Sequence, residues 1–230
     1  MATSAGATPI AAFLRSVPYF ARLNVDELST LAANFAVRRY AKGELIILEG
    51  EPCRGLFLVQ SGRVRIYKTS LEGREQVLNL AGPGDSFNEV PNFDGGPNPA
   101  SAEALAASCV LQLRPDLVLL MVERYPSVAT AMVHGLARRL RHLTTVVEDL
   151  SFKHVTSRLA KVLLEYAAEP AAGHEAGLKQ RLTQTEMAAM IGTAREMVGR
   201  SLKSLEAQGA LRVEHHRIII KNKSLLQKLL

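Results

Sequence analysis

The sequence predicts an α+β protein with a strand-rich first half, a long helix and a small helical domain that ends in a hairpin. Three observations support this fold class. Residues 37–114 form short apolar runs separated by glycine, which is typical of antiparallel strands joined by turns. Apolar residues then recur at helical spacing up to residue 150. Two shorter helical segments and a final alternating stretch follow.

The composition is that of a globular protein with a core of its own. A chain of 230 residues, 47% hydrophobic and 22% charged, suits one large domain or two modest ones. No apolar run reaches the roughly 18–20 residues that span a bilayer, and the first twenty residues lack the basic start of a signal peptide. Cys53 and Cys109 are the two cysteines, so we expect small buried side chains and a cytoplasmic location.

The elements before residue 115 follow from local signals. Asn24 and Glu27 have the spacing of a capping box, which predicts a short helix. The strand-rich region contains one long interruption, "FNEVPNFDGGPNPAS" at residues 87–101, rich in Gly, Pro and Asn. A loop of this kind on a strand scaffold is a candidate binding element.

Residues 115–150 predict a long helix with one apolar stripe. The stripe consists of Val128, Met132, Leu136, Leu140, Leu143, Val147 and Leu150. It could pack inside its own chain, but charges occupy the other faces of the segment "ARRLRHLTTVVEDL". We therefore expect a dimerisation helix that pairs with its copy in a homodimer.

The C-terminal segment predicts two short helices and a hairpin. Thr183 can cap the first helix with Glu186 as its partner, and Gly192 interrupts the helical pattern. A second helix is expected from about residue 193 to 208, ended by Gly209, and "LRVEHHRIIIK" follows as the hairpin. This order of elements is that of a winged helix-turn-helix.

The net charge of +6 comes entirely from this C-terminal part. Residues 151–230 contain 13 Lys and Arg against 7 Asp and Glu, whereas the residues before them are balanced. A basic module attached to a neutral one suggests a polyanionic partner, here double-stranded DNA.

The second helix of this part separates an apolar face from a charged one. Val198, Leu202 and Leu205 fall on one side at about 100° per residue. The other side carries Glu196, Gly199, Arg200 and Lys203, with Arg195 at its flank. Arginine can donate two hydrogen bonds to guanine, and glutamate can accept one from cytosine. Glu196 and Arg200 also have the i, i+4 spacing of an ordinary surface ion pair, which would need no ligand.

The segment "LTQTEMAAMIGTAREMVGRSLKSLEAQGAL" closely resembles the DNA-binding signature of the Crp/Fnr regulators, bacterial transcription factors related to the cyclic-AMP receptor protein. The core pattern G-x-x-R-E-x-V-G-R-x-L-K-x-L-E is matched from Gly192 to Glu206. "KGELIILEGEPCRGLFLVQSGRVRIYK" is similar to the β-roll of that family, a jelly roll like that of cyclic-nucleotide-binding domains. The resemblance implies an effector-sensing domain over residues 1–114, a dimerisation helix over 115–150 and a DNA-binding domain over 151–230.

The resemblance also implies which residues contact DNA. Arg195, Glu196 and Arg200 match the base-contacting positions of the cyclic-AMP receptor branch, whose half-site resembles TGTGA in an inverted repeat. The candidates for phosphate contacts are Thr183, Gln184, Thr193, Lys203, His215, His216 and Arg217. Ala194 departs from the pattern, because the relative carries a serine there. RNA polymerase is the further partner that the family implies.

For the effector, the resemblance implies a pocket but argues against cyclic AMP. The candidate pocket residues are Phe87, Asn88, Glu89, Val90, Ala100, Ser101 and Thr144. Glu89 matches the ribose-binding glutamate, but Pro99 or Ala100 stands where the family has a phosphate-binding arginine. Without that cation, a bound phosphate would lose its hydration and gain no charged hydrogen-bond partner in exchange. We therefore expect an unidentified small-molecule effector, with a cyclic-nucleotide- or haem-dependent regulator of the same fold as the alternative.

Other classes of protein fit the sequence less well. A cupin-type enzyme needs histidine and carboxylate ligands inside the roll, and residues 37–114 contain no histidine. The sequence has no nucleophile elbow, P-loop or dinucleotide-binding fingerprint. A regulatory subunit of a kinase would not need the charged helix. We therefore predict no enzymatic activity, no catalytic residue and no metal site, and no cofactor can be named from the sequence.

Overall fold

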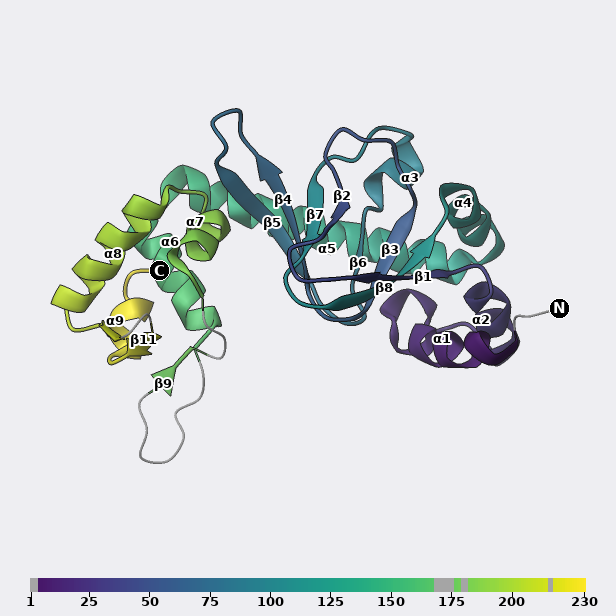
Figure 1. The fold of residues 1–230 in the computed structure, drawn as a ribbon, viewed down its shortest axis with the longest axis horizontal. Helices are drawn as coiled ribbons and strands as arrows, with labels where there is room; N and C mark the ends of the chain where they lie inside the picture. The colour runs from purple at the N-terminus through teal and green to yellow at the C-terminus, as the bar shows by residue number, and fades with distance from the viewer. Residues whose placement is uncertain (1–3, 168–175, 179–181, 215–216) are drawn as a thin grey trace. The chain divides into compact units, whose positions relative to one another are not determined.

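The computed structural model describes residues 4–167, 176–178, 182–214 and 217–230. The chain forms two compact units. The first comprises Met1–Lys68 and Asn79–His142, and the second comprises Thr69–Leu78 and Leu143–Leu230. Figure 1 follows the order of the elements along the chain. Among the helices in the described parts of the chain, none is long and apolar enough to cross a membrane.

Two antiparallel sheets form the β-roll and confirm the predicted α+β class. One sheet has the order β1 (Ala36–Tyr40), β8 (Ser108–Leu113), β3 (Leu56–Ser61) and β6 (Ser86–Phe87). The other has the order β2 (Leu45–Ile47), β7 (Ser101–Ala104), β4 (Val64–Thr69) and β5 (Glu75–Ala81). Neighbouring strands such as β3 and β8 come from distant parts of the sequence, as a jelly roll requires.

Strand β3 contributes side chains to two apolar cores, because successive side chains of a strand point to opposite faces of the sheet. Leu56 and Leu58 pack with the helices of the first unit. Phe57 and Val59 belong to a separate cluster with residues of both sheets, such as Ala102 on β7. These four side chains are all buried, so the first four residues of β3 have no solvent-facing side, whereas Ser61 at its end is exposed.

Short helices complete the first unit. They are α1 (Ser4–Ser16), the 3-10 helix η1 (Pro18–Phe20), α2 (Val25–Ala32) and α3 (Val90–Asp94). Figure 1 shows α1 and α2 together near the start of β1. The predicted capping box of α2 is present: the Glu27 amide donates to Asn24 Oδ1 at 3.0 Å, and the Asn24 amide donates to Glu27 Oε2 at 2.8 Å.

Residues 115–150, predicted as a dimerisation helix, consist of two helices. They are α4 (Pro115–Arg124) and α5 (Pro126–Phe152). Tyr125 separates them with φ −123° and ψ 85°, because a residue before proline is disfavoured in the helical region.

The apolar stripe of α5 also divides into two parts. Val128 and Met132 are buried in the core of the first unit. The exposed apolar residues farther along, together with Val133, form what we call the α5 seam: Val133, Leu140, Leu143, Val147 and Leu150. Their exposed fractions range from 39% at Leu143 to 68% at Leu140.

The second unit contains three core helices and a small sheet. The helices are α6 (Val155–Glu165), α7 (Gln184–Ile191) and α8 (Arg195–Ala207), followed later by α9 (Lys223–Gln227). The sheet has the order β10 (Leu211–Glu214), β11 (Arg217–Ile220) and β9 (Ala176–Gly177). The predicted hairpin is β10 paired with β11, with Leu211 opposite Ile220. One apolar core joins α6, α7, α8 and the hairpin.

The α2 capping box gives a direct test of the described fold. Replacing Asn24 with Ala removes the acceptor for the Glu27 amide, and we expect the free energy of unfolding to fall by about 1 kcal/mol. Urea denaturation followed by far-UV circular dichroism measures the change. Asn24→Asp keeps an acceptor and should remain close to the parent. Equal midpoints for Asn24→Ala and Asn24→Asp would contradict the capping role.

Candidate nucleic-acid interface and effector region

Helices α7 and α8 meet at a tight turn that only glycine satisfies without strain. Thr183 caps α7 by accepting from the Glu186 amide at 3.1 Å, and Glu186 accepts from the Thr183 amide at 2.7 Å. Gly192 ends α7 with φ 64°, a left-handed conformation that other residues rarely adopt. The turn therefore fixes where α8 begins, at Arg195.

Helix α8 buries one face and exposes the other, as the helical wheel predicts. Val198, Leu202 and Leu205 are at most 3% exposed and pack in the core of the second unit. Arg195, Glu196, Arg200 and Lys203 are exposed. Gly199 leaves room beside them, because the nearest atom to an added Cβ would be Gln184 Oε1 at 3.5 Å. Figure 1 shows α8 running along the surface of its unit beside α7.

Glu196 and Arg200 do not form the surface ion pair that their spacing allows. Within the described part of the chain, the recorded side-chain contact of Arg200 is with Met197 Sδ, 3.9 Å from Nη1. Glu196 has no hydrogen-bond or ion-pair partner among the described residues. Two opposite charges four residues apart therefore both face solvent.

Those predicted phosphate contacts that the structure describes have different environments. Lys203 and Arg217 are exposed, whereas Gln184 and Thr193 are half-buried. The Thr183 hydroxyl already donates to Glu186 Oε2 at 2.8 Å as part of the cap. His215 and His216 lie outside the described residues.

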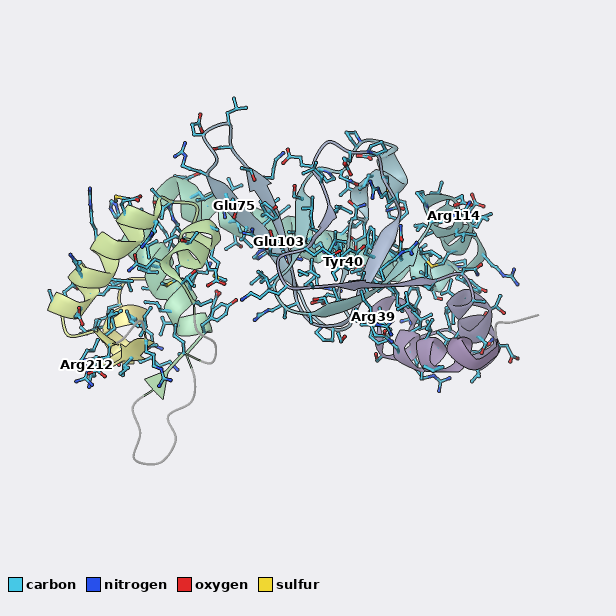
Figure 2. All side chains as sticks on the ribbon, viewed as in Figure 1. Arg39, Tyr40, Glu75, Glu103, Arg114 and Arg212 are labelled. Atoms are coloured by element: carbon cyan, nitrogen blue, oxygen red, sulfur yellow. The ribbon has the colours of Figure 1, made fainter. Side chains whose placement is uncertain are left out.

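Glu206 has a role that the sequence pattern did not reveal. Its Oε1 accepts a hydrogen bond from the Val213 amide at 2.9 Å, which fastens α8 to β10. On the same hairpin Arg212, labelled in Figure 2, pairs with Glu214 at 2.7 Å. The spacing of Glu206 and Val213 follows from the turn at Gly209, whose φ is 72°. A local sequence signal could not have assigned this contact.

Four of the seven predicted effector residues are buried, namely Phe87, Glu89, Ala100 and Ser101. Phe87 stacks on Phe57 with ring centroids 5.1 Å apart. Ala100 and Ser101 are each 5% exposed, and Ser101 Oγ accepts from the Glu49 amide at 3.0 Å. Val90 is 46% exposed, and Thr144 belongs to the second unit.

Amide side chains hold the loop of residues 87–101 closed. Asn88 has φ 68°, and its Nδ2 donates to the Gly55 carbonyl and to Asn98 Oδ1, both at 3.1 Å. Asn98 Nδ2 in turn donates to the Leu48 carbonyl at 3.1 Å. Asn92 Nδ2 donates to the Asn88 carbonyl at 2.5 Å. These neutral amides are concentrated in the segment where the resemblance implied a phosphate site.

Glu89 is 1% exposed and depends on a cation from α5. Arg139 Nη1 donates to Glu89 Oε2, while Nη2 donates to the Ser86 carbonyl and to Ser86 Oγ, the latter at 3.1 Å. Burial opposes the charge of Arg139, but Glu89 outweighs it and the pKa of the guanidinium lies above its ordinary value. The sequence had no signal for this pair, because its partners are 50 residues apart.

Tyr19 completes this buried cluster. Its hydroxyl donates to Glu89 Oε1 at 3.3 Å and accepts from Ser86 Oγ at 3.1 Å. Burial, with the adjacent Glu89 charge, raises the pKa of the Tyr19 phenol.

Across the parts of the chain that the structure describes, no group of three or more His, Cys, Asp or Glu side chains could hold a metal ion.

Family comparisons match both units of the chain. A Cyclic nucleotide-binding domain family model matches residues 37–125, and a Crp-like helix-turn-helix domain model matches residues 157–229. The first match covers both sheets of the roll except Ala36, the first residue of β1, and the second covers α7, α8 and the β10–β11 hairpin.

Individual relatives extend over nearly the whole chain. The Cyclic AMP receptor protein of Thermus thermophilus is 32% identical over 94% of this chain and 98% of its own. A CRP-like cAMP-activated global transcriptional regulator of Mycobacterium tuberculosis is 31% identical over 82% of this chain and 85% of its own. The solved c-di-GMP responsive regulator CLP of Xanthomonas campestris is 26% identical, with a TM-score of 0.75 over 83% of this chain and 95% of its own. The chain belongs to the Crp/Fnr family of DNA-binding transcriptional regulators.

Proposed function

We propose that the protein binds, as a homodimer, an inverted repeat with TGTGA-like half-sites. The observation that carries this proposal is the exposed row of Arg195, Glu196 and Arg200 on α8, with no ion pair between Glu196 and Arg200. An ion pair would have to be broken before either group could reach a base. Here both are available to the bases at the outset.

The chemistry of this row suits the edges of base pairs in the major groove. Each arginine can donate two hydrogen bonds to guanine O6 and N7, and Glu196 can accept from a cytosine amino group. Lys203 and Arg217 are exposed in the same unit and supply charge for phosphate contacts. Because Gly199 has no side chain, the major groove of DNA can approach the helix backbone at this position.

The α5 seam supports the homodimer. A run of exposed apolar side chains along one helix is more stable when it is covered, and a parallel copy of α5 presents the matching surface. Two copies of α8 can then contact two half-sites about one helical turn apart. The family resemblance adds RNA polymerase as the protein partner of the DNA-bound dimer.

We propose that the effector is a small molecule other than cyclic AMP. In the loop of residues 87–101, Pro99 or Ala100 stands at the position of the phosphate-binding arginine, and neutral amides bond to one another. The Glu89 carboxylate is bonded to Arg139 and Tyr19. The competing candidate is a cyclic-nucleotide sensor, which the names of the relatives favour. Those names include both cyclic AMP and c-di-GMP, so the shared fold does not fix the effector. Effector binding would act by shifting the population of dimer conformations that space the two α8 helices for DNA.

Replacing Arg200 with Ala should remove the preference for the inverted repeat. The loss of a bidentate base contact costs about 1–3 kcal/mol of discrimination at each half-site. Gel-shift competition between the repeat and a scrambled duplex measures this preference. Lys228→Ala removes a positive charge elsewhere in the same unit and serves as the control. Unchanged sequence preference in Arg200→Ala would refute the assignment.

Cyclic AMP should not stabilise the protein. Thermal-shift titrations with cyclic AMP and cyclic GMP test this, because a ligand that binds only the folded state raises the melting temperature with concentration. We expect no saturable rise up to millimolar nucleotide. A saturable rise at micromolar concentration would establish the cyclic-nucleotide sensor instead.

Arg139→Met should destabilise the first unit, because it leaves the Glu89 carboxylate buried without its cation. Breaking a buried pair from one side costs about 3 kcal/mol. The double variant Arg139→Met/Glu89→Gln removes both charges and should regain most of that stability. Urea denaturation of both variants provides the comparison. Equal losses in the two variants would show that side-chain packing, not charge, is what Arg139 contributes.

A further inference from the structure

A cavity of the first unit is lined by residues other than the predicted effector residues. Its volume is about 230 Å³, and three segments line it: residues 17–19, residues 79–86 and the α5 residues 135–142. None of the predicted effector residues contributes to its lining. Its apolar surface comes from Val17, Pro18 and Leu80. The cavity is small among ligand pockets, which usually measure about 300–1,000 Å³.

A glycine of α5 shapes the wall of this cavity. A Cβ added at Gly135 would lie 2.7 Å from Tyr19 Oη and 2.9 Å from a carbon of its ring. Glycine therefore allows Tyr19 to lie directly against the helix, where its hydroxyl reaches Ser86 and Glu89. The same Tyr19 and Ser86 line the cavity, so its wall is part of the buried polar cluster.

The lining contains two guanidinium groups, those of Arg138 and Arg139. Within the described ranges, Arg138 and His142 have no hydrogen-bond or ion-pair partner and lie one turn apart on α5. Arg139 lines the same wall and holds Glu89 and Ser86. The one carboxylate of the lining, Asp85, accepts from the Gly82 amide at 2.9 Å and so helps to close its own turn.

Dimerisation through α5 would leave Arg138 and His142 accessible. On a helical wheel with Val133 at 0°, the α5 seam falls between about 260° and 360°, at about 100° per residue. Arg138 and His142 fall at about 140° and 180° on the same wheel. They therefore lie on a different side of α5 from the side that a second copy would cover.

We propose that this cavity binds a small organic anion, a carboxylate with a compact apolar body, and that it is a regulatory site of the protein. Arg138 is the uncommitted cation for the carboxylate, and Val17, Pro18 and Leu80 accommodate the apolar body. Because Arg139, Tyr19 and Ser86 are shared with the Glu89 cluster, a bound anion competes for the group that ties α5 to the roll. The regulatory half of this proposal rests on the proposed DNA-binding function.

Isothermal titration calorimetry of the full-length protein without DNA tests the binding half. The probes are sodium benzoate, the neutral analogue benzyl alcohol and inorganic phosphate. We expect saturable binding of benzoate, none of benzyl alcohol, and at least about tenfold weaker benzoate binding in Arg138→Ala, because a charge-assisted hydrogen bond is lost. Arg22→Ala removes an exposed charge outside the lining and should bind benzoate like the parent.

The outcomes separate this inference from the proposed function. If phosphate binds in an Arg138-dependent way and benzoate does not bind, the proposal of an organic carboxylate is refuted and the site is assigned to an inorganic anion. Absence of binding by both anions, or benzoate binding that Arg138→Ala leaves unchanged, would overturn the site. Gel shifts with the inverted repeat, with and without benzoate, test the regulation: a change in DNA affinity of a few-fold or more supports it, and no change overturns it. Failure of the parent to bind the repeat at all would refute the proposed function, while calorimetry would still report on the cavity.

Discussion

The ion pair between Glu89 and Arg139 joins separate segments of the first unit at one buried point. A carboxylate that is 1% exposed is costly unless a cation and hydrogen bonds compensate it. Arg139 supplies the charge and Tyr19 a further hydrogen bond, so α5, the N-terminal segment and the end of β6 are joined at one point. The same compensation occupies the group that the resemblance implied for a ribose.

Helix α8 follows the opposite rule, since Arg195, Glu196 and Arg200 on its exposed face have no charged partner among the described residues. Val198, Leu202 and Leu205 hold α8 in the core, and Glu206 fastens it to the hairpin. These contacts fix the helix without using Glu196 or Arg200. Direct contact with base edges requires a rigidly positioned helix whose charged side chains are free to bond to the bases.

The helix caps and the faces of α8 could be predicted because they depend on residues close together in the sequence. The Asn24 and Thr183 capping boxes are each set by a partner three residues away. The long helix was predicted less well. Its apolar stripe does not distinguish residues buried in their own core, such as Met132, from exposed ones such as Leu140. Periodicity shows which side of a helix is apolar and does not show what covers it.

The sequence by itself determined the α+β class, the winged helix-turn-helix and the row of charges that faces solvent on α8. Those features arise from local periodicity, capping and glycine conformation, which act within a few residues. Only the tertiary structure decided that Arg139 neutralises Glu89, that Asn88 and Asn98 hold the loop closed, and that a separate cavity lies beside α5. These contacts join segments that are far apart in the sequence and come together only when the two sheets form. Whether a buried charge is compensated depends on which neighbour the folded chain places against it.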